Sequence, residues 1–383
     1  MKLALIRQRY TPFGGAERFM DRAIAALGKE AEITVLAREW RGEAAGYRFV
    51  ECNPPHRNNV QRERGFAEAV RTRLQDSNFD LVQSHERIVP DGVIAPFLYR
   101  AGDGVHATWL RERARAQGFA GSLRNAINPY HRFMVAQERA LFTHANLSGV
   151  ICNSRMVRDD IAARFGLPAE KLHVIYNGVD LEKFRPRQPA DAALRWPETL
   201  GGSGLQADVP LLLYVGSGFE RKGVTNLLMA FARAGGAAQL AIVGADKHAA
   251  RHARLAARLG LGKRVYFAGA VGDVTPWYAA ADAFILPTLY DPMPNAALEA
   301  LACGLPVLTT PTCGAAEFIT EGVNGFVRDA LDIAGLAQAM GWLADPARAA
   351  AMRAAARASV AHLSLDAMAQ QLLSLYQSLI ARG

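Results

Sequence analysis

The amino-acid sequence predicts an α/β protein built from two doubly wound, Rossmann-like parallel-sheet domains. At 383 residues the chain is too long for one typical hydrophobic core. Short apolar runs bounded by turn residues alternate with longer stretches of helical period, which is the pattern of βαβ units. This series stops at a polar, Pro- and Gly-containing region, residues 185–210, and then restarts. Because ligands bind beyond the carboxyl ends of parallel strands, we expect the site in a cleft between the two domains.

Nine apolar runs are expected to form strands, with helices between them. In the first domain, expected at residues 1–180, the strands are Leu3–Ile6, Ile33–Leu36, Leu81–Ser84 and Gly149–Asn153. In the second domain, expected at residues 187–364, they are Leu211–Gly216, Gln239–Gly244, Arg264–Ala268, Ala283–Pro287 and Val307–Thr309.

The net charge and the cysteine pattern indicate which partners and which cellular location to expect. The net charge is +8, and part of the excess is concentrated in residues 100–139, where seven arginines outnumber three acids. Such a segment attracts polyanions. It lacks the alternation of aromatic and basic residues that would stack or specify nucleic-acid bases, so we expect no nucleic acid as partner. We expect an anionic membrane surface or a phosphorylated acceptor instead. The alternative is a solvated helix face. The four cysteines form no CxxC pair and no run reaches membrane-span length, so a cytoplasmic location fits.

The segment Tyr290–Pro306 carries two acids at a loop-to-helix corner. Pro292 and Pro294 cannot lie inside a helix, so the helix is expected to begin near Asn295. Asp291 would then face a sugar and Glu299 a ribose, while the N–H groups at the helix start suit a phosphate. The alternative is an ordinary corner with Glu299 on a solvated face.

The loop Gly216–Val224 places Arg221 and Lys222 after a strand and at the start of a helix. The planar fork of arginine and the point charge of lysine can straddle a diphosphate. A departing diphosphate needs its developing charge neutralised, and without a metal this task falls to cations and helix ends. The chain contains no Asp-x-Asp pair, so we expect no metal site of that kind. Solvated loop cations are the alternative.

The first domain adds four candidate residues. Gly14 and Gly15 open the first helix, where close backbone approach and the helix N-terminus favour a phosphate. Their spacing is not GxGxxG, so a dinucleotide site loses support, and a turn without a ligand is the alternative. Asp103 and His106 follow an expected strand and turn, and either could accept a proton from an attacking hydroxyl. The alternative for His106 is a packed, hydrogen-bonded histidine.

The ordered motifs GSGFERKG, YDPMPNAALEALACGLPVLTT and CGAAEFITEGVNGFV together resemble the retaining glycosyltransferases of family 4, which have the GT-B fold. The resemblance covers nearly the whole chain, and Asn177–Pro186 looks like the bridge between the two domains of that family. Within the family, FGGAERFM and GSGFERKG are most similar to the lipopolysaccharide core glucosyltransferases. Family members also tend to end in a helix that crosses back onto the first domain, which residues 365–383 could do; an ordinary terminal helix of the second domain is the alternative.

The resemblance implies a nucleotide-sugar donor, UDP-glucose, held mainly by the second domain, with no cofactor and no metal. The implied donor-binding residues are Gly14, Gly15, Arg221, Lys222, Asp291, Pro294, Asn295, Ala296 and Glu299. The implied catalytic residues are Asp103 near the acceptor, His106, Arg221, Lys222 and Asp291. The family has Glu where this chain has Asp291, so the donor sugar stays open.

The expected reaction is transfer of a hexose with retention to a lipopolysaccharide core or related lipid-linked glycan, by a peripheral protein on the inner face of the cytoplasmic membrane. The leaving diphosphate would take the proton of the incoming hydroxyl, and domain closure would exclude water. Two rivals stay open. One is a nucleotide-sugar epimerase of the same fold, and the other is a non-catalytic, membrane-associated binding protein, against which the intact Arg221, Lys222 and Glu299 speak.

Overall fold

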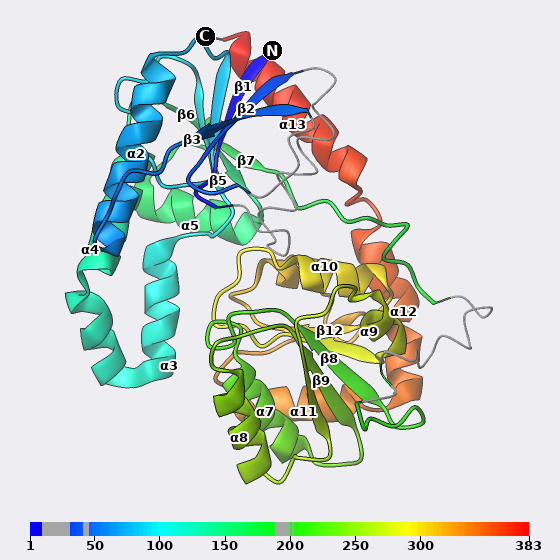
Figure 1. Cartoon of the computed structure of the whole chain (residues 1–383). Helices are drawn as coiled ribbons and strands as arrows, with labels where there is room; N and C mark the ends of the chain where they lie inside the picture. Colours follow the sequence, from blue (N-terminus) through cyan, green and yellow to red (C-terminus); the bar gives the residue numbers. More distant parts are fainter. Residues whose placement is uncertain (10–30, 41–45, 188–199, 201–202, 383) are drawn as a thin grey trace. The chain divides into compact units, whose positions relative to one another are not determined.

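The computed structural model describes residues 1–9, 31–40, 46–187, 200 and 203–382 (Figure 1). The chain divides into two compact units: Met1–Gly178 with Leu365–Gly383, and Val179–Ser364. Each unit contains one sheet whose paired strands all run parallel. The predicted pair of Rossmann-like parallel-sheet domains is therefore confirmed.

The sheet of the first unit has seven strands in the order β3-β2-β1-β4-β5-β6-β7. Their bounds are β1 Lys2–Ile6, β2 Glu32–Ala37, β3 Tyr47–Glu51, β4 Leu81–Ser84, β5 Phe97–Ala101, β6 Leu147–Cys152 and β7 Leu172–Val174. The sequence order turns back between β1 and β4, so the topological switch point of this sheet lies there. The carboxyl ends of β1 and β4 therefore mark the edge where ligands are expected to bind.

Helices cover both faces of the first sheet. They are α2 Asn59–Gln75, α3 His106–Ile127, α4 Pro129–Phe142, α5 Arg155–Phe165 and α13 Leu365–Ile380, with the 3-10 turn η1 Ala169–Lys171. The terminal helix α13 packs Met368, Leu372 and Tyr376 into one core cluster with Leu3 and Leu98 of the sheet. Apolar burial of this kind fixes α13 to the first unit although it is the last helix of the chain.

The sheet of the second unit has six strands in the order β10-β9-β8-β11-β12-β13. The strands are β8 Leu211–Val215, β9 Gln239–Val243, β10 Val265–Gly269, β11 Ala283–Ile285, β12 Val307–Thr309 and β13 Gly325–Val327. The helices are α7 Val224–Ala234, α8 Ala249–Arg258, α9 Thr275–Ala280, α10 Asn295–Ala302, α11 Ile333–Leu343 and α12 Pro346–Val360, with the 3-10 turn η3 Gly314–Phe318. Here the strand order turns back between β8 and β11, which places the loops after these two strands side by side.

Three expectations about the organisation need correction. The predicted strands left out β3, β7 and β13, and gave no bounds to β5. The second unit begins at Val179, whereas residue 187 was expected, and much of the polar region 185–210 lies outside the described residues. The basic segment was expected to include Arg100, but this side chain lies inside β5 and is 2% exposed. Arg100 therefore adds nothing to a basic surface.

Candidate functional site

The loop that joins β8 to α7 is pressed against the exit of β11. Gly223 has φ +74, and a Cβ there would lie 1.9 Å from the carbonyl oxygen of Pro287, so only glycine fits. The N–H of Leu289 donates to the carbonyl oxygen of Arg221 at 2.8 Å. The two loops at the switch point of the second sheet are therefore held together by direct backbone contact.

These loops bring the two predicted cations onto one predicted acid. The Nζ atom of Lys222 lies 2.9 Å from Oδ2 of Asp291, and Nη1 of Arg221 lies 3.6 Å from the same oxygen. Arg221 also donates from Nη1 to the carbonyl oxygen of Tyr290 at 3.0 Å. The side chains of Lys222 and Asp291 are 12% and 8% exposed, whereas that of Arg221 is 37% exposed. Asp291 thus supplies the counter-charge for two cations, of which Arg221 is the more exposed.

The backbone of Asp291 is fixed from the neighbouring strand exit. Its N–H donates to the carbonyl oxygen of Thr312 at 3.0 Å, and its own carbonyl oxygen accepts from the N–H of Gly314 at 2.9 Å. Burial, and next the charge of Asp291, raises the pKa of the Cys313 thiol to about 12, so this thiol stays protonated beside the carboxylate. The carboxylate of Asp291 is therefore held in place from both sides.

Helix α10 begins at Asn295, as the two prolines predict, and Pro294 is its N-cap residue. Within this described helix the first turn contains no acidic residue, and no side chain caps it. The first N–H groups of a helix have no partner inside the helix, so those of Asn295 and Ala296 suit an anion.

Glu299 lies in α10 and is buried, with 3% of the residue exposed. The hydroxyl of Tyr278 lies 3.2 Å from Oε2 of Glu299 and 3.0 Å from the carbonyl oxygen of Ala296. The alternative of a solvated glutamate is therefore wrong. Its contact with a ribose stays a prediction.

Two tyrosines near these residues were missed by the sequence analysis. Tyr278 comes from α9 and reaches Glu299 across 21 positions of sequence. Tyr214 comes from β8, is fully buried, and its hydroxyl has no hydrogen-bond partner within the described residues. Burial raises the pKa of Tyr214 well above its usual range, so it stays neutral beside Arg221 and Asp291. No short-range pattern in the sequence could have placed either tyrosine beside these residues.

In the first unit, Asp103 lies directly after β5 and its side chain is 62% exposed. Nη1 of Arg7 lies 3.9 Å from Oδ2 of Asp103 and 3.3 Å from Oε1 of Glu86. Asp103 is flanked by Gly102 and Gly104, which have no side chains to cover it. Arg7 thus links the exposed acid to a mostly buried one at the carboxyl edge of the sheet.

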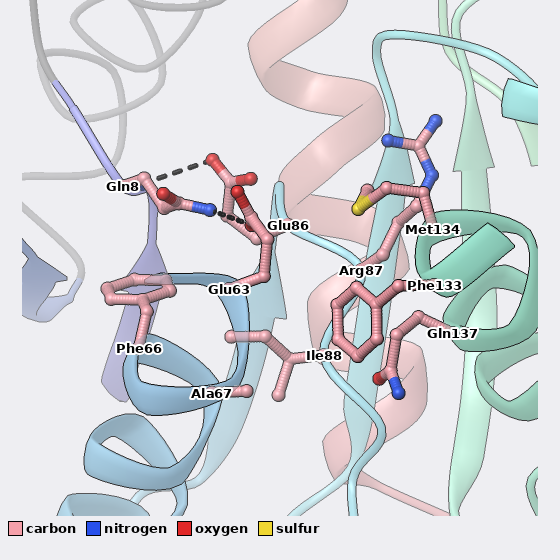
Figure 2. A pocket seen from close by; sticks show the side chains of 10 residues that line it. All are labelled: Gln8, Glu63, Phe66, Ala67, Glu86, Arg87, Ile88, Phe133, Met134 and Gln137. Atoms are coloured by element: carbon pink, nitrogen blue, oxygen red, sulfur yellow. Dashed lines mark hydrogen bonds between the residues drawn. The ribbon is translucent and has the colours of Figure 1, made fainter. Parts of the chain in front are cut away.

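Glu86 lines a small cavity at this edge (Figure 2). The cavity volume is about 10 Å³, which is room for about one water molecule. The N–H of Gln8 donates to Oε1 of Glu86 at 3.1 Å, and its side-chain amide donates to Glu63. Burial raises the pKa of Glu86 against the opposing charge of Arg7. The cavity is too small for a sugar. Its lining residues therefore support the carboxyl edge of the first sheet and do not form a sugar-binding site.

His106 is the first residue of α3, and its ring lies on a second histidine. Nε2 of His106 is 3.1 Å from Nδ1 of His131. Burial, and next the charge of Arg87, lowers the pKa of His106 to about 3, so the ring is neutral near pH 7. The backbone N–H of His106 donates to Oε1 of the buried Glu138 at 2.8 Å. The ring is packed and hydrogen-bonded, as the alternative expects, and its low pKa makes it a weak proton acceptor. A contact with substrate stays a prediction.

Gly14 and Gly15 lie outside the described residues, so their role stays a prediction. Among the residues that the structure describes, no three His, Cys, Asp or Glu side chains gather as ligands for a metal ion. Within the same residues, no helix combines the length and the hydropathy that crossing a membrane requires.

Comparison with known proteins identifies the family. Residues 13–183 match the model described as Glycosyltransferase Family 4, and residues 209–345 match that of Glycosyl transferases group 1. A D-inositol 3-phosphate glycosyltransferase of Catenulispora acidiphila is 30% identical over 73% of both chains. The chain belongs to glycosyltransferase family 4. The two matches fall one on each structural unit.

Other relatives of this family 4 glycosyltransferase differ in substrate. The lipopolysaccharide glucosyltransferase WaaG of Escherichia coli K12 is 26% identical over 85% of both chains. A GDP-mannose-dependent phosphatidylinositol monomannoside mannosyltransferase of Mycolicibacterium smegmatis is 28% identical over 92% of this chain and 91% of its own.

Solved structures show that the fold is GT-B. The crystal structure of WaaG superposes with a TM-score of 0.82 over 98% of this chain and 99% of its own, at 23% identity. That of Anabaena HepE in complex with UDP-glucose gives a TM-score of 0.74 over 99% and 100%, at 22% identity.

Proposed function

We propose that this family 4 glycosyltransferase transfers glucose from UDP-glucose to a hydroxyl of a lipopolysaccharide core or related lipid-linked glycan, with retention at the anomeric carbon. The observation that carries the proposal is the cluster of Lys222, Arg221 and Asp291 beside the start of α10. Relatives add support, because one is a lipopolysaccharide glucosyltransferase and another was solved with UDP-glucose.

The cluster suits the departure of a diphosphate. A bound diphosphate would place its negative charge against Lys222 and Arg221, while Asp291 turns to the sugar hydroxyls. As the bond to the anomeric carbon breaks, the cations and the N–H groups of α10 stabilise the oxygen that leaves. That oxygen then takes the proton of the incoming hydroxyl on the same face, so no nucleophile from the protein is needed. Asp103 would orient the acceptor from the first unit.

The nucleotide and the sugar of the donor need a test of their own, because one relative is GDP-mannose-dependent. A panel of UDP-glucose, UDP-galactose, UDP-N-acetylglucosamine and GDP-mannose, scored by protection against thermal unfolding, tests it. We expect the largest protection from UDP-glucose. Equal protection by GDP-mannose would overturn the proposal that the donor is a uridine nucleotide.

Transfer is tested with radiolabelled UDP-glucose and a lipopolysaccharide core acceptor, and the anomeric configuration of the product is determined by NMR. We expect sugar on the acceptor in the α configuration of the donor. An epimerase would convert the donor without an acceptor, and a binding protein would protect against unfolding without any turnover. Either result would replace the proposed function.

We also propose that the protein is peripheral on the inner face of the cytoplasmic membrane and docks through the α3–α4 region. Gly118, with φ +69, breaks α3, and Phe119, Leu123 and Ile127 beyond it are 85%, 54% and 66% exposed. Large exposed apolar side chains beside several arginines are typical of a helix that lies on anionic lipid.

Flotation with vesicles that contain an anionic lipid tests the docking surface. We expect binding at low salt that Phe119→Asp abolishes and that neutral vesicles do not support. Ile94→Asp is the matched control, because Ile94 is fully exposed in the same unit but lies outside this region. Binding that survives Phe119→Asp would contradict the assignment.

A further inference from the structure

Arg38 carries a buried guanidinium group whose hydrogen bonds, within the described residues, go to Asn53 and His56. The residue directly follows β2 and is 3% exposed. Its Nε and Nη2 atoms donate to Oδ1 of Asn53 at 3.0 and 2.9 Å, and Nη2 lies 3.4 Å from Nδ1 of His56. In the part of the chain that the structure describes, Nη1 has no hydrogen-bond partner. Since a buried ion without an opposite charge is costly, an anion bound beside Nη1 of Arg38 would be stabilised.

The two described acids whose charge acts on Arg38 are each paired with another arginine. Glu63 lies 2.8 Å from Nη2 of Arg62, and Glu39 lies 3.6 Å from Nη2 of Arg9. Burial lowers the pKa of Arg38, and the charges of Arg62 and Arg9 lower it further, ahead of the opposing effect of the two glutamates. Among these described residues, three arginines and two glutamates, positive charge is therefore in excess around Arg38.

The surface above Arg38 is accessible and favours negative charge. Asn53 and His56 are exposed, and the segment they belong to leads into the 17-residue helix α2. The first turn of α2 contains no acidic residue, and its N-cap residue Asn58 accepts from the N–H of Gln61. The segment that Arg38 contacts therefore leads to the positive end of a helix dipole, which also favours an anion.

The position along the sheet connects this cluster to the acceptor. β2 lies beside β1, and the N–H of Arg38 donates to the carbonyl oxygen of Gln8, directly after β1. Arg7 precedes Gln8 and lies 3.9 Å from Asp103, the proposed acceptor residue. Arg38 and Asp103 therefore belong to the same carboxyl edge of the first sheet.

We propose that Arg38, with His56 and the start of α2, binds an anionic group, a phosphate or a carboxylate, carried by the sugar acceptor. The proposal rests on the proposed function, because it names the chemical class of the acceptor. The planar guanidinium suits either group, since both present two oxygens to its fork. An acceptor bound in this way would be selected by its charge as well as by its sugar.

A binding experiment on the full chain without donor tests the site directly. Glucose 6-phosphate and glucuronate are the anionic probes, glucose is the neutral one, and binding is followed by NMR titration. We expect the anions to bind at least about tenfold more tightly than glucose, and Arg38→Gln to remove this difference. Arg48→Gln is the matched control, because Arg48 is exposed on β3 and its loss removes the same charge. Preference for one of the two anions would identify the group.

A second variant and a transfer assay test the anion site independently of whether Arg38→Gln folds. His56→Ala changes an exposed side chain, so it is expected to fold and to weaken anion binding several-fold even if Arg38→Gln does not fold. In transfer assays, Arg38→Gln should raise KM for a phosphorylated acceptor about tenfold and leave KM for the donor unchanged. Anion binding that is the same in wild type and both variants would overturn the proposal. If wild type transfers no sugar, the proposed function fails, while the binding experiment still decides on the anion site.

Discussion

Replacement of Lys222 by methionine removes one charge from the cluster and keeps the length of the side chain. Its Nζ atom lies 2.9 Å from Asp291, and the two side chains are 12% and 8% exposed. Loss of one partner from a buried ion pair costs about 3–5 kcal/mol, because the other charge is left buried. Arg221 still faces Asp291 at 3.6 Å, so we expect a loss near the lower end, about 3 kcal/mol.

The effect on transfer is expected to exceed the effect on folding. Removal of one preorganised charge that stabilises a leaving group lowers kcat by about 10²–10³-fold. Addition of Asp291→Asn to the Lys222→Met variant removes the buried charge that was left, so stability should largely return while transfer should not. Urea unfolding measures the first quantity and turnover of UDP-glucose in the presence of acceptor measures the second.

A matched control separates the cluster from general charge effects. Lys183 belongs to the same unit, is 52% exposed, and pairs with Asp273 at 3.8 Å. Lys183→Met should change stability by less than about 1 kcal/mol, because exposed pairs contribute little, and should leave turnover unchanged. Turnover of Lys222→Met within threefold of wild type would refute the role given to the cluster.

Three further predictions concern the loop, the histidine and the exposed acid. Gly223→Ala should destabilise the protein by at least about 2 kcal/mol in urea unfolding, because its Cβ would lie 1.9 Å from Pro287, whereas Gly218→Ala, with φ +75 and open space around it, should cost only about 1 kcal/mol. The unfolded chain protonates His106 near pH 6.5 and the folded chain only near pH 3, so this residue favours folding less as pH falls through that window. His106→Asn should therefore reduce the slope of unfolding free energy against pH by up to about 1.4 kcal/mol per unit, and an unchanged slope would contradict the shift. Asp103→Asn should lower kcat with acceptor and leave the affinity for UDP unchanged in calorimetry; weaker UDP binding would argue against an acceptor role.

The residues that could be predicted from the sequence are those whose position follows from a short pattern. Two prolines place the start of α10 at Asn295. Arg221, Lys222 and Asp291 each follow a strand, and because β8 and β11 pair at the switch point, their loops meet. Strand exits and helix starts are local features, so the chain itself reveals them.

The features that were missed depend on contacts between distant parts of the chain. Arg100 interrupts the apolar run of β5, although its side chain is buried and donates to Asn177, 77 positions away. The edge strand β3 has mostly exposed residues and no apolar run to reveal it. Glu299 is a charged residue in an otherwise apolar helix, and its contact with Tyr278 is a long-range one that the sequence does not reveal. No pattern of spacing marks such pairs.

A crystal structure of the full chain with UDP-glucose tests the account most directly. We predict the diphosphate within hydrogen-bond distance of Nζ of Lys222 and of the first N–H groups of α10, with the glucose hydroxyls on Asp291. The same structure would test the predicted cleft between the domains. A well-occupied nucleotide bound elsewhere, with the pair of Lys222 and Asp291 undisturbed, would contradict the account.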